Sequence, residues 1–139
     1  MVAPVETTDL FSATRERYRS RFPHLGADFI SAVEDEFKVW CGLHRLEQIE
    51  KNPIWITTEL LWLDEFWHDC LLEPEEYARA CREIVGKPLE HVVFNKHTDA
   101  PLSRERFQEQ LRVLGGLIGP EKLRKWYVEY PKQFQKPAS

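Results

Sequence analysis

The sequence predicts an all-α fold, a compact bundle of five or six helices that forms a single domain over residues 1–139. Its 139 residues fit one domain, since domains commonly contain about 100–150 residues. Apolar residues recur three and four positions apart in several segments, which is typical of amphipathic helices. Proline and glycine residues separate these segments, and no internal repeat interrupts them.

The first half of the chain contains two predicted helices. Helical spacing of apolar residues predicts a helix over residues 8–22, which Pro23 ends. Asp28 is expected to cap a second helix that continues to Ile49, because Asp is a preferred N-cap residue. The residues expected on the buried face of this second helix are Val33, Phe37, Trp40 and His44.

Two further helices, over residues 57–71 and 74–85, are predicted to form a hairpin joined at Glu73 and Pro74. A threonine is expected to cap the first of them. Proline is favoured at the first position of a helix, which places the start of the second helix. Gly86 is expected to end this helix, because glycine adopts the left-handed conformation that often follows a helix.

The last part of the chain is predicted to contain two more helices. Ser103 is expected to cap a helix that runs to Ile118. Gly119 and Pro120 start another helix, which is expected to end before Pro131 because proline disrupts helix interiors. The segments expected outside helices are residues 89–95, as a loop or short strand, and the mobile ends 1–7 and 133–139.

The composition argues against several classes of protein. The formal charge of −4 and a pI near 5.8 predict no nucleic-acid partner. The apolar runs are far shorter than the roughly 20 residues needed to span a bilayer, and no secretory signal opens the chain, so we expect no membrane association. Three widely spaced cysteines do not form a disulfide framework, and we expect reduced thiols and a cytoplasmic location.

The candidate functional site begins with Asp64 and His68, which lie four residues apart on the third predicted helix and therefore on one face. This face borders the apolar stripe, where an acid and an imidazole are unfavourable unless they are paired or bind a metal. Glu65 and Asp69 are expected to face solvent. Two interpretations stay open, a structural Asp64–His68 hydrogen bond or a metal site in which the carboxylate binds the metal or orients the imidazole.

Two more residues could extend this site. His44 is either a core histidine or a ligand that converges on His68. Cys70 is either a ligand or a small buried hydrophobic residue, because two helical residues rotate by about 200° and turn it away from His68. If Cys70 bound a metal, the metal would protect its thiolate from alkylation.

A longer pattern surrounds these residues. The run from Leu63 to His68, Leu-Asp-Glu-Phe-Trp-His, is followed by Leu71, Leu72, Tyr77, Cys81, Gly86 and His91. Over residues 30–93 the chain resembles a bacterial family related to the N-terminal domain of plant glycine-rich domain-containing proteins. This resemblance implies a helical fold and makes His68 and His91 the principal functional residues, with Asp64 next. Cys70 stands where many relatives carry a second histidine, and Glu90 replaces the first histidine of a pair.

These observations predict a small cytosolic metal-binding protein, in which the metal is zinc, iron or copper. The predicted metal ligands are His68, His91 and Asp64, with His44 and Cys70 as additional candidates. If the protein is an enzyme, Asp64, His68 and His91 are the catalytic residues of a hydrolytic or oxidative reaction on a small organic substrate. Trp67 and Tyr77 are expected to line the cofactor pocket. The alternative is a non-catalytic protein-interaction module in which the same polar residues are structural.

Overall fold

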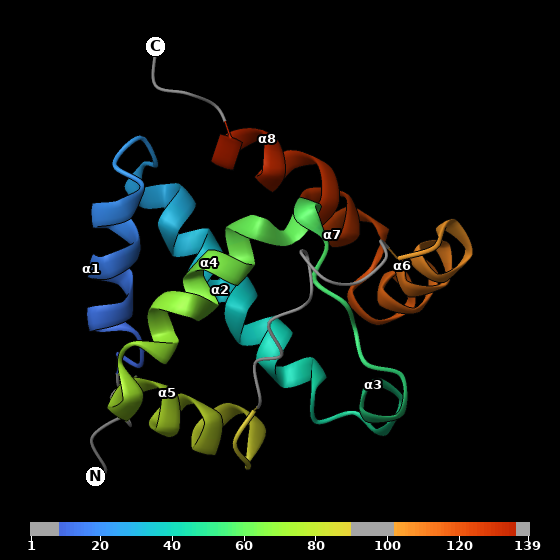
Figure 1. The fold of residues 1–139 in the computed structure, drawn as a ribbon, viewed down its shortest axis with the longest axis horizontal. Helices are drawn as coiled ribbons and strands as arrows, with labels where there is room; N and C mark the ends of the chain where they lie inside the picture. Colours follow the sequence, from blue (N-terminus) through green and yellow to red (C-terminus); the bar gives the residue numbers. More distant parts are fainter. Residues whose placement is uncertain (1–8, 90–101, 136–139) are drawn as a thin grey trace, which may run out of the picture.

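A computed structural model describes residues 9–89 and 102–135. These residues form helices and connecting segments without a β-strand, so the predicted all-α fold is confirmed. Helix α4 (Leu61–Leu71) crosses α2 (Ala27–Leu43) near the centre of the molecule and also packs against α1 (Ser12–Arg21) (Figure 1). The helix that carries Asp64 and His68 is therefore the central element of the bundle.

Helix α2 is shorter than the sequence predicts. It ends at Leu43 instead of Ile49, and a separate helix, α3 (Glu47–Lys51), follows. The imidazole Nδ1 of His44 lies 2.8 Å from the Trp40 carbonyl oxygen, which would otherwise accept the helical hydrogen bond from the backbone N–H of His44. That N–H bonds instead to the carbonyl of Cys41, so the side chain of His44 helps to end the helix.

Two consecutive helices lie where the hairpin is predicted, and Leu72 and Glu73 separate them. A 3₁₀ turn, η1 (Thr58–Leu60), leads into α4, and α5 (Pro74–Ala80) continues as the π turn η2 (Cys81–Val85). Thr57 precedes η1, although its hydroxyl makes no capping hydrogen bond. Gly86 ends the hairpin with a φ of 91°, the left-handed conformation expected there.

The C-terminal helices begin where the sequence predicts, but the last one ends later than predicted. Ser103 caps α6 (Arg104–Ile118), and its Oγ accepts a hydrogen bond of 3.1 Å from the backbone N–H of Arg106. The elements that follow are α7 (Pro120–Arg124), the π turn η3 (Lys125–Glu129) and α8 (Tyr130–Gln135). The prediction that helix ends before Pro131 is wrong. Pro131 is the second residue of α8, and the helical backbone continues through it from the π turn η3, which directly precedes α8.

Tryptophan rings connect the layers of the core. Trp67 lies 6.1 Å from Trp40, Trp40 lies 6.0 Å from Trp126, and Trp126 lies 6.1 Å from Trp62, measured between ring centroids. All four rings are buried. This indole line runs from α4 through α2 to η3 and back to the start of α4, and it joins the C-terminal helices to the rest of the core.

Candidate functional site

Asp64 and His68 lie together on α4, as the sequence predicts. The side chain of Asp64 is 5% exposed and that of His68 is 34% exposed, so the carboxylate is buried and the imidazole reaches solvent. The imidazole Nε2 lies 3.7 Å from Oδ2 of Asp64. Because this separation is too long for a hydrogen bond, the two atoms do not form the structural bond that the first interpretation requires.

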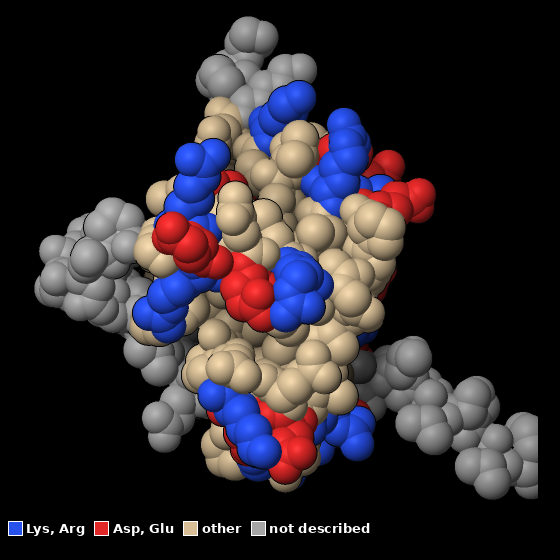
Figure 2. All heavy atoms as spheres, turned by 90° about the vertical axis from the view of Figure 1, so that its right-hand side faces the viewer, with Lys and Arg blue, Asp and Glu red and all other residues tan. Residues whose placement is uncertain are grey.

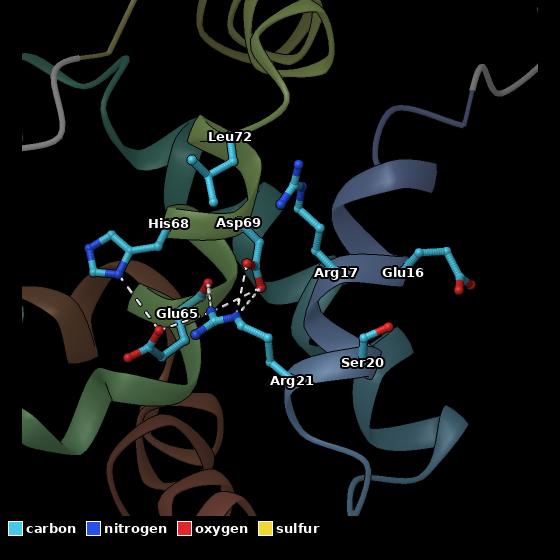
Figure 3. A pocket seen from close by; sticks show the side chains of 8 residues that line it. All are labelled: Glu16, Arg17, Ser20, Arg21, Glu65, His68, Asp69 and Leu72. Carbon is cyan, nitrogen blue, oxygen red and sulfur yellow. Dashed lines mark hydrogen bonds and ion pairs between the residues drawn. The ribbon is translucent and has the colours of Figure 1, made fainter.

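A second carboxylate faces the other nitrogen of His68. The imidazole Nδ1 lies 3.7 Å from Oε1 of Glu65, and the same carboxylate forms an ion pair of 2.9 Å with Nη2 of Arg21. The imidazole therefore lies between two carboxylates, one buried and one held by an arginine from α1. Figure 3 shows Arg21 reaching from α1 to α4, whereas the His68 ring points away from α1.

Asp69 is buried, and the expectation that it faces solvent is wrong. Its Oδ1 accepts a hydrogen bond of 3.0 Å from Nε of Arg21, and its Oδ2 accepts one of 3.0 Å from Nη2. Burial raises the pKa of Asp69, and the neighbouring Arg21 opposes this rise. The helical pattern missed this pair because helix α1 covers a face of α4 that looks polar in the sequence.

A shallow pocket of about 470 Å³ lies between α1 and α4 (Figure 3). The residues that line it are Glu16, Arg17, Ser20, Arg21, Glu65, His68, Asp69 and Leu72. Leu72 is 59% exposed and supplies an apolar edge beside the imidazole. Trp67 and Tyr77, which we expected to line the pocket, are not among its lining residues.

Trp67 and Tyr77 nevertheless contact one another. The indole Nε1 of Trp67 donates a hydrogen bond of 3.4 Å to the Tyr77 hydroxyl, which in turn donates to the carbonyl of Leu89. Burial raises the pKa of Tyr77 and keeps its hydroxyl protonated. These two hydrogen bonds thus connect α4 to α5 and to Leu89, which follows η2. His91 and the other residues of 90–101 lie outside the described residues, as do residues 1–8 and 136–139.

His44 lies at the end of α2 and not in the middle of its buried face. Its ring packs edge-on against Trp40 and Trp67, with centroids 5.3 Å and 6.2 Å away. Because the Trp40 carbonyl can only accept a hydrogen bond, Nδ1 carries the proton and Nε2 carries the lone pair. Burial lowers the pKa of His44, which keeps the ring neutral at pH 7.

The three cysteines are free and buried. Cys70 lies against Thr14 of α1, and burial raises the pKa of its thiol to about 12. Since α4 remains a regular helix through Leu71, Cys70 points to the side opposite His68. Within residues 9–89 and 102–135, no three histidine, cysteine, aspartate or glutamate side chains form a group that could hold one metal ion.

The surface shows no further concentration of charge on the face drawn in Figure 2. Lys and Arg side chains alternate there with Asp and Glu among the described residues. Of the helices described, none is both long and apolar enough to cross a bilayer.

The fold and the site define an all-α protein whose central helix presents a histidine between two carboxylates. No family model, no curated protein and no solved structure matches this chain. A functional assignment therefore depends on the geometry around His68.

Proposed function

We propose that this protein binds a transition-metal ion through Asp64 and His68, with His91 as the third protein ligand. The separation of 3.7 Å between Nε2 of His68 and Oδ2 of Asp64 carries this proposal. Zinc binds imidazole nitrogen and carboxylate oxygen at about 2.0–2.2 Å. Two ligand atoms 3.7 Å apart therefore subtend an angle of roughly 120° at such an ion, near the tetrahedral geometry that zinc adopts.

The burial of Asp64 supports the same ligand pair. The side chain of Asp64 is 5% exposed, and a divalent cation bound beside it would neutralise its carboxylate. His68 is one-third exposed, so an ion reaches the pair from solvent. Imidazole and carboxylate ligands suit zinc and iron, and imidazole also suits copper.

The proposal includes a chemical role and a cellular location. Three protein ligands leave one position of a tetrahedral ion for water, which the metal would activate for hydrolysis of a small organic substrate, and an iron or copper ion would support oxidative chemistry. The resemblance to the bacterial family through Trp67, His68 and His91 supports these residues. Three buried thiols fit a reducing cytoplasm.

Metal analysis of protein purified without a histidine tag tests the proposal. After incubation with zinc, iron or copper and removal of excess ion, we expect about one ion per chain for one of the three metals. His68→Ala and Asp64→Asn should each lose this ion. His24→Ala is the matched control, because His24 is an exposed histidine whose Nε2 lies 2.8 Å from the Phe134 carbonyl, and it should bind as the wild type does.

Two results would contradict the proposal. One is a wild-type chain that retains none of the three metals, and the other is metal retention that survives both substitutions. If His68→Ala lowered Tm and reduced partner binding only in proportion to the loss of folded protein, the protein would be an interaction module with a structural histidine.

A further inference from the structure

We propose that the indole line, extended by Tyr130, carries an oxidising equivalent through the core from α4 to α8, where a soluble reductant removes it. A one-electron oxidant near Trp67, such as a radical derived from peroxide, starts the sequence. Each ring then takes one electron from the next ring, so the electron vacancy moves the opposite way. This inference is independent of metal binding, because it uses none of the proposed metal ligands.

An unbroken series of ring contacts joins the two ends. Successive centroids of the indole line, from Trp67 to Trp62, lie 6.1 Å, 6.0 Å and 6.1 Å apart. The ring of Tyr130 extends the series, since its centroid lies 4.9 Å from that of Trp62. Electron transfer slows steeply with distance, and indole and phenol lose an electron more readily than aliphatic side chains. The four buried indoles and this phenol are therefore suited to pass an electron along.

Tyr130 is the end of the path because a base stands beside it. Its hydroxyl donates a hydrogen bond of 3.2 Å to Oε2 of Glu36. Burial, together with this carboxylate, raises the pKa of Tyr130 to about 12, so the phenol is protonated at pH 7. An oxidised phenol is a strong acid. When Tyr130 gives up an electron, its O–H bond breaks, the proton goes to Glu36, and a neutral phenoxyl radical remains.

The same carboxylate also serves Trp126, whose Nε1 donates a hydrogen bond of 3.1 Å to Oε1 of Glu36. An oxidised indole at this position can lose its N–H proton to Glu36. The electron from Tyr130, passed on by Trp62, then restores the indole. Trp126 recovers its proton from Glu36 while Tyr130 gives its own proton to the same carboxylate. No net charge is created in the interior during this exchange, where isolated charge is unfavourable.

The other end of the path has no such base. Nε1 of Trp67 donates to the Tyr77 hydroxyl, which donates to the Leu89 carbonyl, and a carbonyl is too weak a base to take the proton of an oxidised phenol. Among the described residues, Nε1 of Trp40 is buried without an acceptor, so an oxidised Trp40 keeps its proton and remains a strong oxidant. The vacancy therefore moves away from Tyr77 and settles on Tyr130.

The phenoxyl radical returns to the resting state at the surface. Tyr130 is partly exposed, so a soluble thiol or ascorbate can reach its ring. The reductant supplies one electron, and the proton held by Glu36 returns to the phenolic oxygen. The path thus removes oxidising equivalents before they damage the core.

A photo-oxidant attached at one position tests the proposal. Leu72→Cys introduces a thiol at an exposed residue at the end of α4, whereas the three native cysteines are buried, so a ruthenium polypyridyl maleimide should label the new thiol alone. A light flash with an external electron acceptor leaves ruthenium(III), which takes one electron from the protein. We expect a tyrosyl radical, identified by optical absorption and electron paramagnetic resonance, and its decay should accelerate when glutathione is added.

Two tyrosine variants of the labelled chain form a matched pair. Tyr130→Phe removes one hydroxyl, and the tyrosyl signal should be lost while a tryptophan radical persists. Tyr127→Phe makes the same change three residues earlier, where the ring contacts Phe107 and the hydroxyl accepts a hydrogen bond from Gln110. This control should retain the tyrosyl signal of the labelled parent.

Trp40→Phe interrupts the indole line and should lower the tyrosyl yield although Tyr130 is intact. Circular dichroism establishes whether this variant folds, and the pair of tyrosine variants decides the matter if it does not. A tyrosyl radical that survives in Tyr130→Phe, or that disappears in Tyr77→Phe, would overturn the proposal. An unchanged tyrosyl yield in folded Trp40→Phe would overturn it as well. None of these outcomes bears on the proposed metal site.

Discussion

His44 illustrates how one side chain can set both the end of a helix and its own protonation state. Its Nδ1–H donates a hydrogen bond to the carbonyl of Trp40, so the backbone N–H of His44 does not bond to that carbonyl and α2 ends there. The same bond and two indole edges partly bury the ring. Burial lowers the pKa of His44 from its ordinary value of 6.5, because the interior disfavours the charged imidazolium.

This shift predicts a loss of stability in mild acid. The unfolded chain binds a proton near pH 6.5 while the folded chain does not, so the stabilising contribution is present above the unfolded pKa and is lost as the pH falls. Each unit of pKa difference corresponds to about 1.4 kcal/mol. Urea denaturation from about pH 7.5 to about pH 5.5 should show a smaller decrease in unfolding free energy for His44→Gln than for the wild type.

The control for this experiment is His24→Gln, which alters an exposed histidine. It should show the full pH-dependent decrease of the wild type. An identical pH dependence in the wild type and His44→Gln would contradict the assignment of a neutral, partly buried imidazole to His44.

At the scale of elements, α1 begins with a cap supplied by a distant helix. Phe11 at the N-cap position makes no side-chain hydrogen bond. Glu76 of α5 instead accepts hydrogen bonds from the backbone N–H groups of Ala13 at 2.7 Å and Thr14 at 3.0 Å, and one of 2.8 Å from the Thr14 hydroxyl. A carboxylate there satisfies helix donors that α1 leaves unpaired, and its charge is favourable at the positive end of the helix.

Removal of this cap should release the start of α1. Glu76→Ala is expected to lower the unfolding free energy by about 2–3 kcal/mol, because a charge-assisted cap and a helix–helix contact disappear together. Hydrogen exchange should accelerate at the amides of Ala13 and Thr14. Glu75→Ala, an exposed glutamate on the same helix, should leave both quantities near their wild-type values. Unchanged exchange at the two amides in Glu76→Ala would rule out the capping role.

Across the whole molecule, one buried carboxylate joins the N-terminal and C-terminal helices. Glu36 of α2 accepts hydrogen bonds from Nζ of Lys122 at 3.0 Å, Nε1 of Trp126 at 3.1 Å and the hydroxyl of Tyr130 at 3.2 Å. These donors come from α7, η3 and α8. All three C-terminal elements are therefore attached to α2 through a single side chain.

Loss of this carboxylate should detach the C-terminal helices before the rest unfolds. Glu36→Ala leaves a buried indole N–H without this acceptor, which we expect to lower the unfolding free energy by about 2–4 kcal/mol. Hydrogen exchange in residues 120–135 should increase more than in α1. The exposed neighbour provides the control, since Asp35→Ala should change exchange little. A uniform increase across all helices would contradict this special role of Glu36.

The sequence predicts the helices and the Asp64–His68 pair because both depend on local spacing. Periodicity, Pro74, Gly86 and Ser103 place most helix ends within a few residues of those observed. Partners distant in the chain follow from tertiary packing, which spacing does not encode. The contact of Arg21 with Asp69 is of this kind, as is the carboxylate that caps α1.

The indole line in the core gives the protein intrinsic optical signals that depend on how its helices pack. Excitation absorbed by one ring passes to the next across centroid distances of 6.0 Å and 6.1 Å, and transitions held at fixed angles couple to one another. The folded chain should therefore give a strong near-ultraviolet circular dichroism signal that weakens when α2, α4 or η3 shifts. A copper(II) ion bound at His68, the residue after Trp67, would quench emission from the whole line.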